Sequence, residues 1–217
     1  MNSHGAFEFP PLHSFAPFYT LQPNIQTAQT QIEHWGQLVL SYCAVHRRFT
    51  IDAYGEFEQV GPLFRNEALD RAASPELIRL ILAHLVSKGR AVYDPPLPRG
   101  VKAPTIEKTP SDSRTNARSA SSGIVYAPSD ATAYRATIYW KLPEEWADAL
   151  ASWVSDTGQN GSIFTLFELV HGDFGKKYGE LPLSLLRLAI EVLTKRGRAQ
   201  LVKGTGDGEW ADGVKIV

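Results

Sequence analysis

Residues 77–91 read LIRLILAHLVSKGRA, and residues 185–199 read LLRLAIEVLTKRGRA. Both stretches repeat apolar residues at helical intervals, which predicts a helix with one buried face. Gly89 and Gly197 then stand where a helix commonly ends in a left-handed residue. The chain therefore contains an internal repeat, and each copy includes a long amphipathic helix.

The repeat extends to both sides of these helices. The first half is predicted to form a helix over 26–46, a strand over 49–51, a helix over 63–72, and strands over 90–93 and 134–141. The second half is predicted to form a helix over 143–156, a strand over 164–166, a helix over 165–171, and strands over 199–202 and 214–217. Helix, strand, helix, helix and hairpin is the order of a winged helix. The predicted fold class is α+β, mainly α, with two winged-helix domains in tandem.

The domain boundaries follow from this order. Residues 1–23 form an extended proline- and aromatic-rich arm, residues 24–141 the first winged helix, and residues 142–217 the second. The first hairpin carries an insert, 95–131, rich in Pro, Ser and Thr. Such a segment buries too little apolar surface to offset its ordering entropy, so we expect it to be disordered. Tryptophans near the border are expected to pack the halves together: Trp140, Trp146 and Trp153.

Composition limits the function further. The net charge is −1, so no overall basic field favours nucleic acid or an anionic membrane. Cys43 is the only cysteine, which excludes an internal disulfide and fits a reducing compartment. No apolar run is long enough to span a bilayer, and the N-terminus lacks the pattern of a signal peptide. We expect a cytoplasmic chain whose membrane contact is indirect, through partners.

The sequence gives no sign of catalytic or cofactor chemistry. The glycine-rich run at 204–208 lacks the dinucleotide fingerprint and indicates a hairpin turn. The histidines show no paired ligand spacing, and Cys43 lies on an apolar stripe as a small buried thiol would. Glu144 and Glu145 open a helix, where they complement its dipole. We predict a protein that is not an enzyme, with no metal and no cofactor.

A winged helix also suggests nucleic-acid binding, which remains the alternative function. The outward residues of the two long helices would have to read base edges, and they are mixed in charge: Glu76, Arg79, His84 and Lys88, then Arg187, Glu191, Lys195 and Arg196. Neither set forms a row of Arg, Asn or Gln suited to the major groove. A solvated surface explains these charges more simply, so no nucleic acid is expected as a partner.

The arm contains two near-copies of Pro-Pro-x-Tyr, at Pro10–His13 and Ala16–Tyr19. Proline holds a chain near polyproline II, so binding it costs little backbone entropy, and a following ring can fill a pocket. We therefore predict a docking arm. The same residues allow the arm to pack on its own first domain. A WW-domain ligand fits less well, because His13 and Ala16 break that pattern.

Two long stretches resemble a known family. These are FEFPPLHSFAPFYTLQPN at 7–24, followed by a helix with Trp35, and KLPEEWADALASWVSDTGQNGSIFTLFEL at 141–169. They are similar to the vacuolar protein sorting-associated protein 25 family, the small subunits of the ESCRT-II complex. The final GVKIV also fits. The resemblance covers nearly the whole chain except the insert.

The resemblance implies two winged helices that make protein–protein contacts. It implies that two copies of the chain dock on the two larger ESCRT-II subunits, and that the second domain recruits the initiating ESCRT-III subunit. It assigns partner binding to Pro10, Pro11, Leu12, His13, Pro17, Phe18 and Tyr19. The expected function is a non-catalytic adaptor in multivesicular body sorting of ubiquitinated cargo, recruited to the endosomal membrane.

Overall fold

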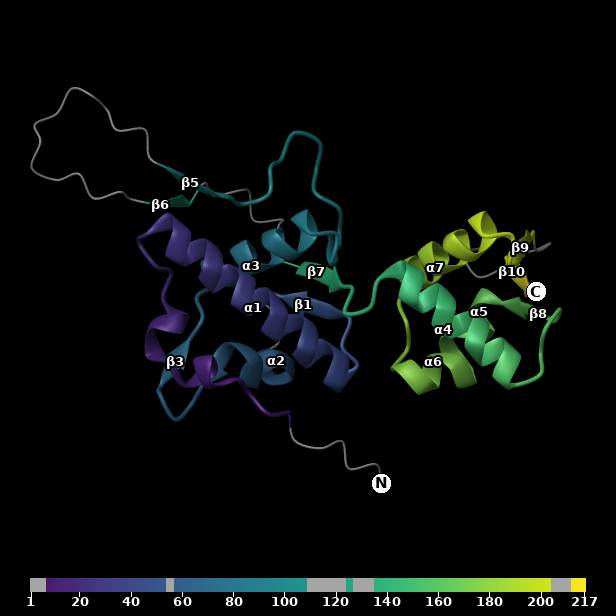
Figure 1. The fold of residues 1–217 in the computed structure, drawn as a ribbon. Coiled ribbons are helices and arrows are strands. Elements are labelled where there is room, and N and C mark those ends of the chain that lie inside the picture. Colours follow the sequence, from purple (N-terminus) through teal and green to yellow (C-terminus); the bar gives the residue numbers. More distant parts are fainter. Residues whose placement is uncertain (1–6, 54–56, 109–123, 127–134, 204–211) are drawn as a thin grey trace, which may run out of the picture. The chain divides into compact units, whose positions relative to one another are not determined.

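The computed structural model describes residues 7–53, 57–108, 124–126, 135–203 and 212–217. It is a mixture of helices and short antiparallel strands, which confirms the predicted α+β class. The chain divides into two compact units, Met1–Ile138 and Tyr139–Val217 (Figure 1). The border predicted from the sequence, 141/142, falls a few residues after this division.

The first unit has the element order expected for a winged helix. Two 3-10 turns, η1 (Pro11–Ser14) and η2 (Ala16–Tyr19), precede α1 (Ile25–His46), β1 (Thr50–Asp52), α2 (Phe57–Phe64), β2 (Arg65–Asn66), β3 (Arg71–Ala72), α3 (Pro75–Ser87), β4 (Ala91–Tyr93), β5 (Ile106–Lys108), β6 (Ile124–Tyr126) and β7 (Arg135–Ile138). Three strands form an antiparallel sheet in the order β1-β7-β4.

Local signals set the limits of the long helices in this unit. The Asn24 side chain accepts a hydrogen bond from the Thr27 amide at 3.1 Å and caps α1, which ends at Arg47 in the left-handed conformation. Ser74 caps α3, and Pro75 takes the first helical position, where no amide hydrogen is needed. These caps satisfy backbone groups that would otherwise be unpaired at the helix ends.

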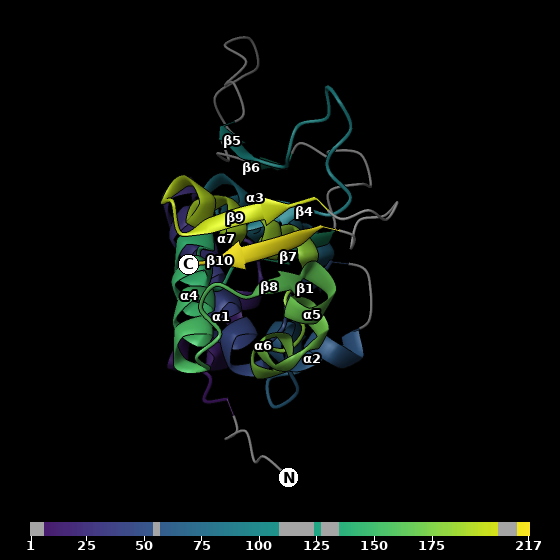
Figure 2. The same ribbon diagram turned by 90° about the vertical axis from the view of Figure 1, so that its right-hand side faces the viewer.

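The second unit repeats this order. It consists of α4 (Pro143–Asp156), β8 (Ile163–Thr165), α5 (Leu166–His171), α6 (Asp173–Tyr178), α7 (Leu183–Lys195), β9 (Ala199–Val202) and β10 (Gly213–Ile216). The strands form an antiparallel sheet in the order β8-β10-β9, and Figure 2 shows β9 and β10 side by side. The turn predicted at 204–208 lies outside the described residues, while the two strands flanking it pair with each other.

Aromatic rings fill the interior of the second unit. Trp146 is completely buried. Its ring centroid lies 4.8 Å from that of Trp140 and 5.0 Å from that of Tyr178. The ring centroids of Trp153 and Phe174 are 5.6 Å apart. The sequence suggested that these tryptophans pack the two halves together. All three of these ring contacts join residues of the second unit, so they belong to its own core.

The second helix of each unit departs from the sequence prediction. In the first unit the prediction of a helix over 63–72 is wrong, because α2 ends at Phe64 and a β2–β3 pair follows. The Asn66 side chain there accepts a hydrogen bond from the Leu69 amide, and Asp70 has a φ of 47°, which a helix does not allow. In the second unit the predicted helix is present as α5, and the sequence reading missed α6.

The insert also differs from the prediction of disorder over 95–131. Ile106–Lys108 pairs with Ile124–Tyr126 in antiparallel register, and Pro104 is buried in the first unit. Strand β5 contacts α1, and Figure 1 shows β5 beside the N-terminal end of this helix. The prediction is wrong for these residues, because the backbone pairing of β5 with β6 and the burial of Pro104 give this part of the insert a defined place. Residues 109–123 and 127–131 lie outside the described residues.

Candidate docking site

The N-terminal arm does not extend from the first unit but folds into two 3-10 turns. The His13 amide donates to the Pro10 carbonyl at 2.9 Å, and the Phe18 amide donates to the Phe15 carbonyl at 2.9 Å. Each turn has a proline at its start, whose fixed φ suits this geometry. The predicted extended conformation is therefore replaced by two compact turns.

The second turn is held by helix α1. The Phe18 ring stacks on Trp35 with centroids 4.2 Å apart and an interplanar angle of 5°. The Phe18 carbonyl accepts hydrogen bonds from the Trp35 indole at 3.0 Å and from the side-chain Nε2 of Gln31 at 2.7 Å. Because Phe18 is only 4% exposed, its ring and its backbone are both part of the unit's interior.

The first turn, η1, is held by a hydrogen bond to helix α2 of the same unit. Nε2 of the buried His13 lies 3.2 Å from the Leu63 carbonyl, and the ring stacks on Phe9. Burial lowers the pKa of His13, so the ring is neutral at pH 7 and can donate from Nε2. Burial also raises the pKa of Tyr19 to about 12, and its hydroxyl donates to the His13 carbonyl at 3.0 Å. The two half-motifs therefore lock each other in place.

These contacts divide the predicted partner-binding residues into two groups. His13, Phe18 and Tyr19 are each at most 5% exposed and face the unit's own core. The alternative in which the arm packs on its own domain thus describes these three side chains. The other group faces outward: Pro10, Pro11 and Pro17 are exposed, and Leu12 is half-buried.

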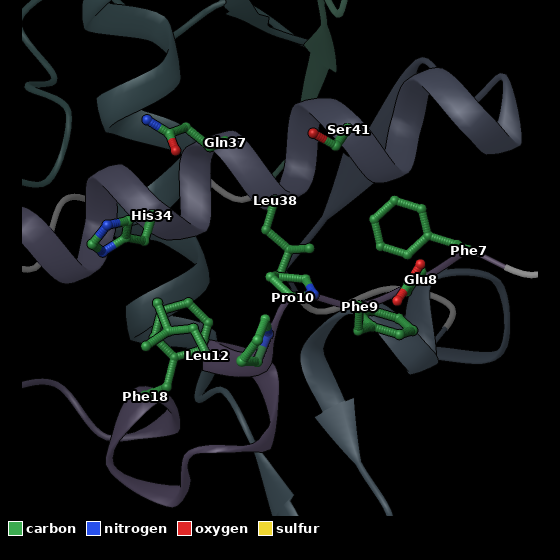
Figure 3. A pocket seen from close by; sticks show the side chains of 11 residues that line it. Phe7, Glu8, Phe9, Pro10, Leu12, Phe18, His34, Gln37, Leu38 and Ser41 are labelled. Carbon is green, nitrogen blue, oxygen red and sulfur yellow. The ribbon is translucent and has the colours of Figure 1, made fainter.

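A groove of about 570 Å³ runs between the outward side of the arm and α1. Its apolar surface comes from Phe9, Pro10, Leu12, Phe18 and Leu38 (Figure 3). Phe15, 53% exposed, lies in a smaller hollow next to it that also includes Leu12 and Pro17. An apolar groove with a polar rim is the usual form of a site for a partner's side chains.

The sequence reading missed the α1 side of this groove. His34, Gln37 and Ser41 are exposed on α1 and line it together with Glu8 (Figure 3). Their spacing of three and four residues places them on one face of the helix, next to the buried stripe. That spacing is visible in the sequence, but only the position of the arm shows that this face borders a groove.

The second unit has a groove of its own, of about 370 Å³, between α7 and β9. Leu166, Ile190 and Leu201 supply its apolar lining. Its polar lining comes from Arg187, Glu191, Thr194, Lys195 and Asp212. Leu201 is 56% exposed although it sits in a strand, so the groove is open to solvent.

Other kinds of site find little support in the described part of the chain. No cluster of His, Cys, Asp and Glu there could hold a metal ion. Cys43 is fully buried, and desolvation raises its pKa to about 12, as expected of an inert thiol. No helix among the described residues is long and apolar enough to cross a membrane.

The nucleic-acid alternative loses one of its candidate contacts. Arg79 on α3 is only 5% exposed and cannot enter a groove of DNA from that position. On α7, Lys195 is paired with Glu191 at 2.8 Å, which reduces the positive potential of that face. Two winged-helix-like units and two apolar grooves with polar rims instead define a class of protein that binds other proteins.

Comparison with known proteins gives the family. Residues 12–182 match a family described as ESCRT-II complex subunit, and the chain belongs to this family. Vacuolar protein-sorting-associated protein 25 of Xenopus laevis is 31% identical over 90% of this chain and 92% of its own length. The human protein of that name is 30% identical over 91% of this chain and 92% of its own length.

Solved structures agree with this assignment. A crystal structure of subunit VPS25 of the endosomal trafficking complex ESCRT-II superimposes with a TM-score of 0.66 at 26% identity, over 96% of this chain and 98% of that one. A chain in the crystal structure of endosomal complex ESCRT-II (VPS22/VPS25/VPS36) gives a TM-score of 0.64 at 26% identity, over 95% of this chain and 98% of that one. The family resemblance inferred from the sequence is confirmed.

Proposed function

We propose that this chain is the small adaptor subunit of an ESCRT-II complex. The observation that carries the proposal is the match, over nearly the whole chain, to a subunit solved both alone and together with VPS22 and VPS36. The family is described by its place in a complex rather than by a reaction, which agrees with the non-catalytic role expected from the sequence. In this role the protein acts in multivesicular body sorting of ubiquitinated cargo, as a cytoplasmic chain recruited to the endosomal membrane.

The arm and α1 together form the surface that docks on the two larger subunits. The complex contains two copies of this chain, and each larger subunit binds one copy. The outward residues Pro10, Pro11, Leu12 and Pro17 make the contact. His13, Phe18 and Tyr19 act from inside by fixing the turns that present them. A groove fixed in advance loses little conformational entropy on binding, which favours affinity.

A substitution on α1 tests this surface without touching the core. Ser41 is exposed and lines the groove, so Ser41→Arg fills it with a long charged side chain. Gln29→Arg is the matched control, because Gln29 is exposed on the same helix and is not among the groove residues. We expect Ser41→Arg to lower co-purification with the larger subunits at least tenfold and Gln29→Arg to leave it unchanged. Equal recovery of both variants would place the docking surface elsewhere.

The second unit is the proposed output end, which recruits the initiating ESCRT-III subunit. A groove with an aliphatic lining and a charged rim suits an amphipathic helix, whose apolar residues would meet Leu166, Ile190 and Leu201. Charge of both signs on α7, from Arg187 to Lys195, would select the register of that helix.

Thr194→Arg tests the output end, because Thr194 is exposed and lines this groove. Titration of the ESCRT-III subunit into the full-length chain should show weaker binding for this variant, with joining to the larger subunits unchanged. Ser184→Arg is the control at an exposed position on the same helix outside the groove residues. Unaltered ESCRT-III binding by Thr194→Arg would remove this groove from the proposal and leave the docking role standing.

A further inference from the structure

One face of the second unit's sheet has mostly exposed side chains in the part of the chain that the structure describes. Ladder pairing places Ile163, Lys215 and Gln200 in one row and Thr165, Gly213 and Val202 in the next. Because side chains alternate along a strand, these residues share one face. The residues between them point the other way, toward the helices, and Val214 and Ile216 are at most 1% exposed. We call the first set the outer sheet face.

Aliphatic side chains lie open on the outer sheet face. Ile163 is 60% exposed and Val202 is 37% exposed. Gly213 in the central strand has no side chain, and a Cβ added there would lie 3.2 Å from Cγ2 of Ile163. Ile163 therefore extends toward the middle strand. Ile163 and Val202 thus present aliphatic surface on the two edge strands, on either side of the central strand.

The charged side chains on this face have one sign. Lys215 stands in the central strand, and its alkyl stem can cover apolar surface while the ammonium stays in water. Arg198 is exposed, and its carbonyl accepts the Val217 amide at 2.9 Å, which continues the ladder and its alternation. The three strands Ile163–Thr165, Ala199–Val202 and Gly213–Ile216 contain no Asp or Glu.

The described carboxylates of this unit lie outside these strands, on its helices and in its connections, with Asp212 directly before β10. Glu144 and Glu145 lie in the first turn of α4, and Asp173 begins α6. Asp148 on α4 is already paired with Arg196 at 2.6 Å, so Arg196 does not contribute a free cation. Among the described residues, the charged side chains of the outer sheet face are Arg198 and Lys215, so these residues make the face positive although the whole chain has a net charge of −1.

We propose that the outer sheet face docks on the surface of an anionic lipid bilayer. Exposed aliphatic side chains with cations among them are the combination that binds such an interface, since apolar burial and attraction to lipid phosphates add. The residues that carry it are Ile163, Val202, Arg198 and Lys215. An acidic protein segment has the same charge complementarity. A bilayer fits better because the aliphatic side chains stand on both edge strands of the sheet, on either side of the central strand that carries Lys215, rather than in one groove.

This inference goes beyond the adaptor role, in which membrane contact is made through other subunits. It also uses a different surface from the groove between α7 and β9, because Leu201, which lines that groove, lies on the opposite face of the sheet. A chain that touched the membrane here could still offer its groove to a helix.

Flotation of the full-length chain with vesicles tests the proposal. Two vesicle preparations are compared, one of phosphatidylcholine alone and one enriched in phosphatidylserine. Each cation near an anionic surface raises binding roughly fivefold, so Arg198 and Lys215 together give about a 25-fold preference for anionic vesicles. Raising the salt concentration should reduce this preference.

Two double variants with the same change of charge separate a specific face from general attraction. Arg198→Glu with Lys215→Glu should abolish the preference for anionic vesicles. Lys176→Glu with Lys177→Glu, at exposed positions on α6, should keep it. Ile163→Ser should lower binding severalfold without removing the preference. Circular dichroism checks that each variant is folded.

Three results would overturn the proposal. The first is failure of the unmodified chain to float with anionic vesicles. The second is equal loss of flotation in both double variants, which would indicate attraction to the whole molecule. The third is binding of soluble polyglutamate, sensitive to the Arg198 and Lys215 changes, without any binding to vesicles, which would assign the face to an acidic protein.

Discussion

The long helices α3 and α7 come from the same sequence repeat but have different surroundings. Leu80 is 3% exposed on α3, whereas Leu188 at the matching position of α7 is 36% exposed. Ala83 is 8% exposed, and its counterpart Glu191 is an exposed acid paired with Lys195. The repeat thus preserves the face that packs on the unit's own core and leaves the other face free to change.

Additional chain distinguishes the two units. The first unit has the arm before α1 and the insert after β4, and parts of both are buried in it, including Phe18 and Pro104. The second unit has no such arm, and the segment between its hairpin strands is short. The first unit is therefore covered in part by chain that has no counterpart in the described part of the second.

The largest effect should come from the same substitution at the two repeat positions. Leu80→Asp places a carboxylate in the core of the first unit and should lower the free energy of unfolding by about 4 kcal/mol or more. Leu188→Asp adds a charge at a solvated position and should change it by less than about 1 kcal/mol. Urea unfolding followed by circular dichroism measures both. Similar losses would mean that α7 is as enclosed as α3.

The next effect concerns the arm as part of the first unit. Phe18→Ala removes a ring stacked on Trp35 and should cost about 3 kcal/mol of unfolding free energy. Phe15→Ala, in the same arm at 53% exposure, should cost within about 0.5 kcal/mol. Thermal melts of the two variants provide the measurement. An unchanged melting temperature for Phe18→Ala would show that the arm does not stabilise the first unit. That result would support an extended docking segment instead.

A smaller effect is expected from the insert. Replacing 97–131 with a short Gly/Ser turn shortens a loop, which changes closure entropy by less than about 1 kcal/mol. It also exposes the surface now covered by Pro104 and by the half-buried Val101 and Ile106, which should cost on the order of 1–2 kcal/mol. A net loss near 1 kcal/mol in urea unfolding supports the packed segment. A gain in stability would show that the insert contributes nothing to the first unit.

The smallest effect tests a cap of the second unit. The Glu168 carboxylate accepts hydrogen bonds from the Thr165 amide at 2.8 Å and its hydroxyl at 2.9 Å, and these lower its pKa below the ordinary value of 4.5. A lowered folded pKa stabilises the fold above the unfolded pKa, and this stability is lost as pH falls through the folded pKa.

Glu168→Gln should therefore cost about 0.3–1 kcal/mol at neutral pH, the range for an exposed charge at a helix start. The difference between the variant and the unmodified chain should shrink as pH is lowered below 4.5. Urea midpoints measured from pH 7 to pH 3 follow this difference. A difference that stays constant with pH would mean that the carboxylate makes no stabilising contact in the folded state.

Much of the fold was predictable because its signals are local. Helical spacing identified α1, α3, α4 and α7, and in the structure α3 starts at Pro75 and α4 at Pro143. The helix over 63–72 failed because apolar spacing there resembles a helix, while the Asn66 side chain and the positive φ of Asp70 make a turn. The candidate site was half predicted: the arm was recognised from its prolines and rings, and the groove wall on α1 was not.

The sequence by itself determined the repeat, the order of elements, the family and the arm as a special segment, since periodicity, caps and motifs depend on residues close together in the chain. Only the tertiary structure decided that Phe18 is buried and Phe15 exposed, because Trp35, on which Phe18 stacks, comes from another element. It also decided that Arg198 and Lys215 share one face of a sheet whose described strands contain no acidic residue. Net charge is a sum over the whole chain, whereas the potential at a surface depends on which side chains the fold brings together.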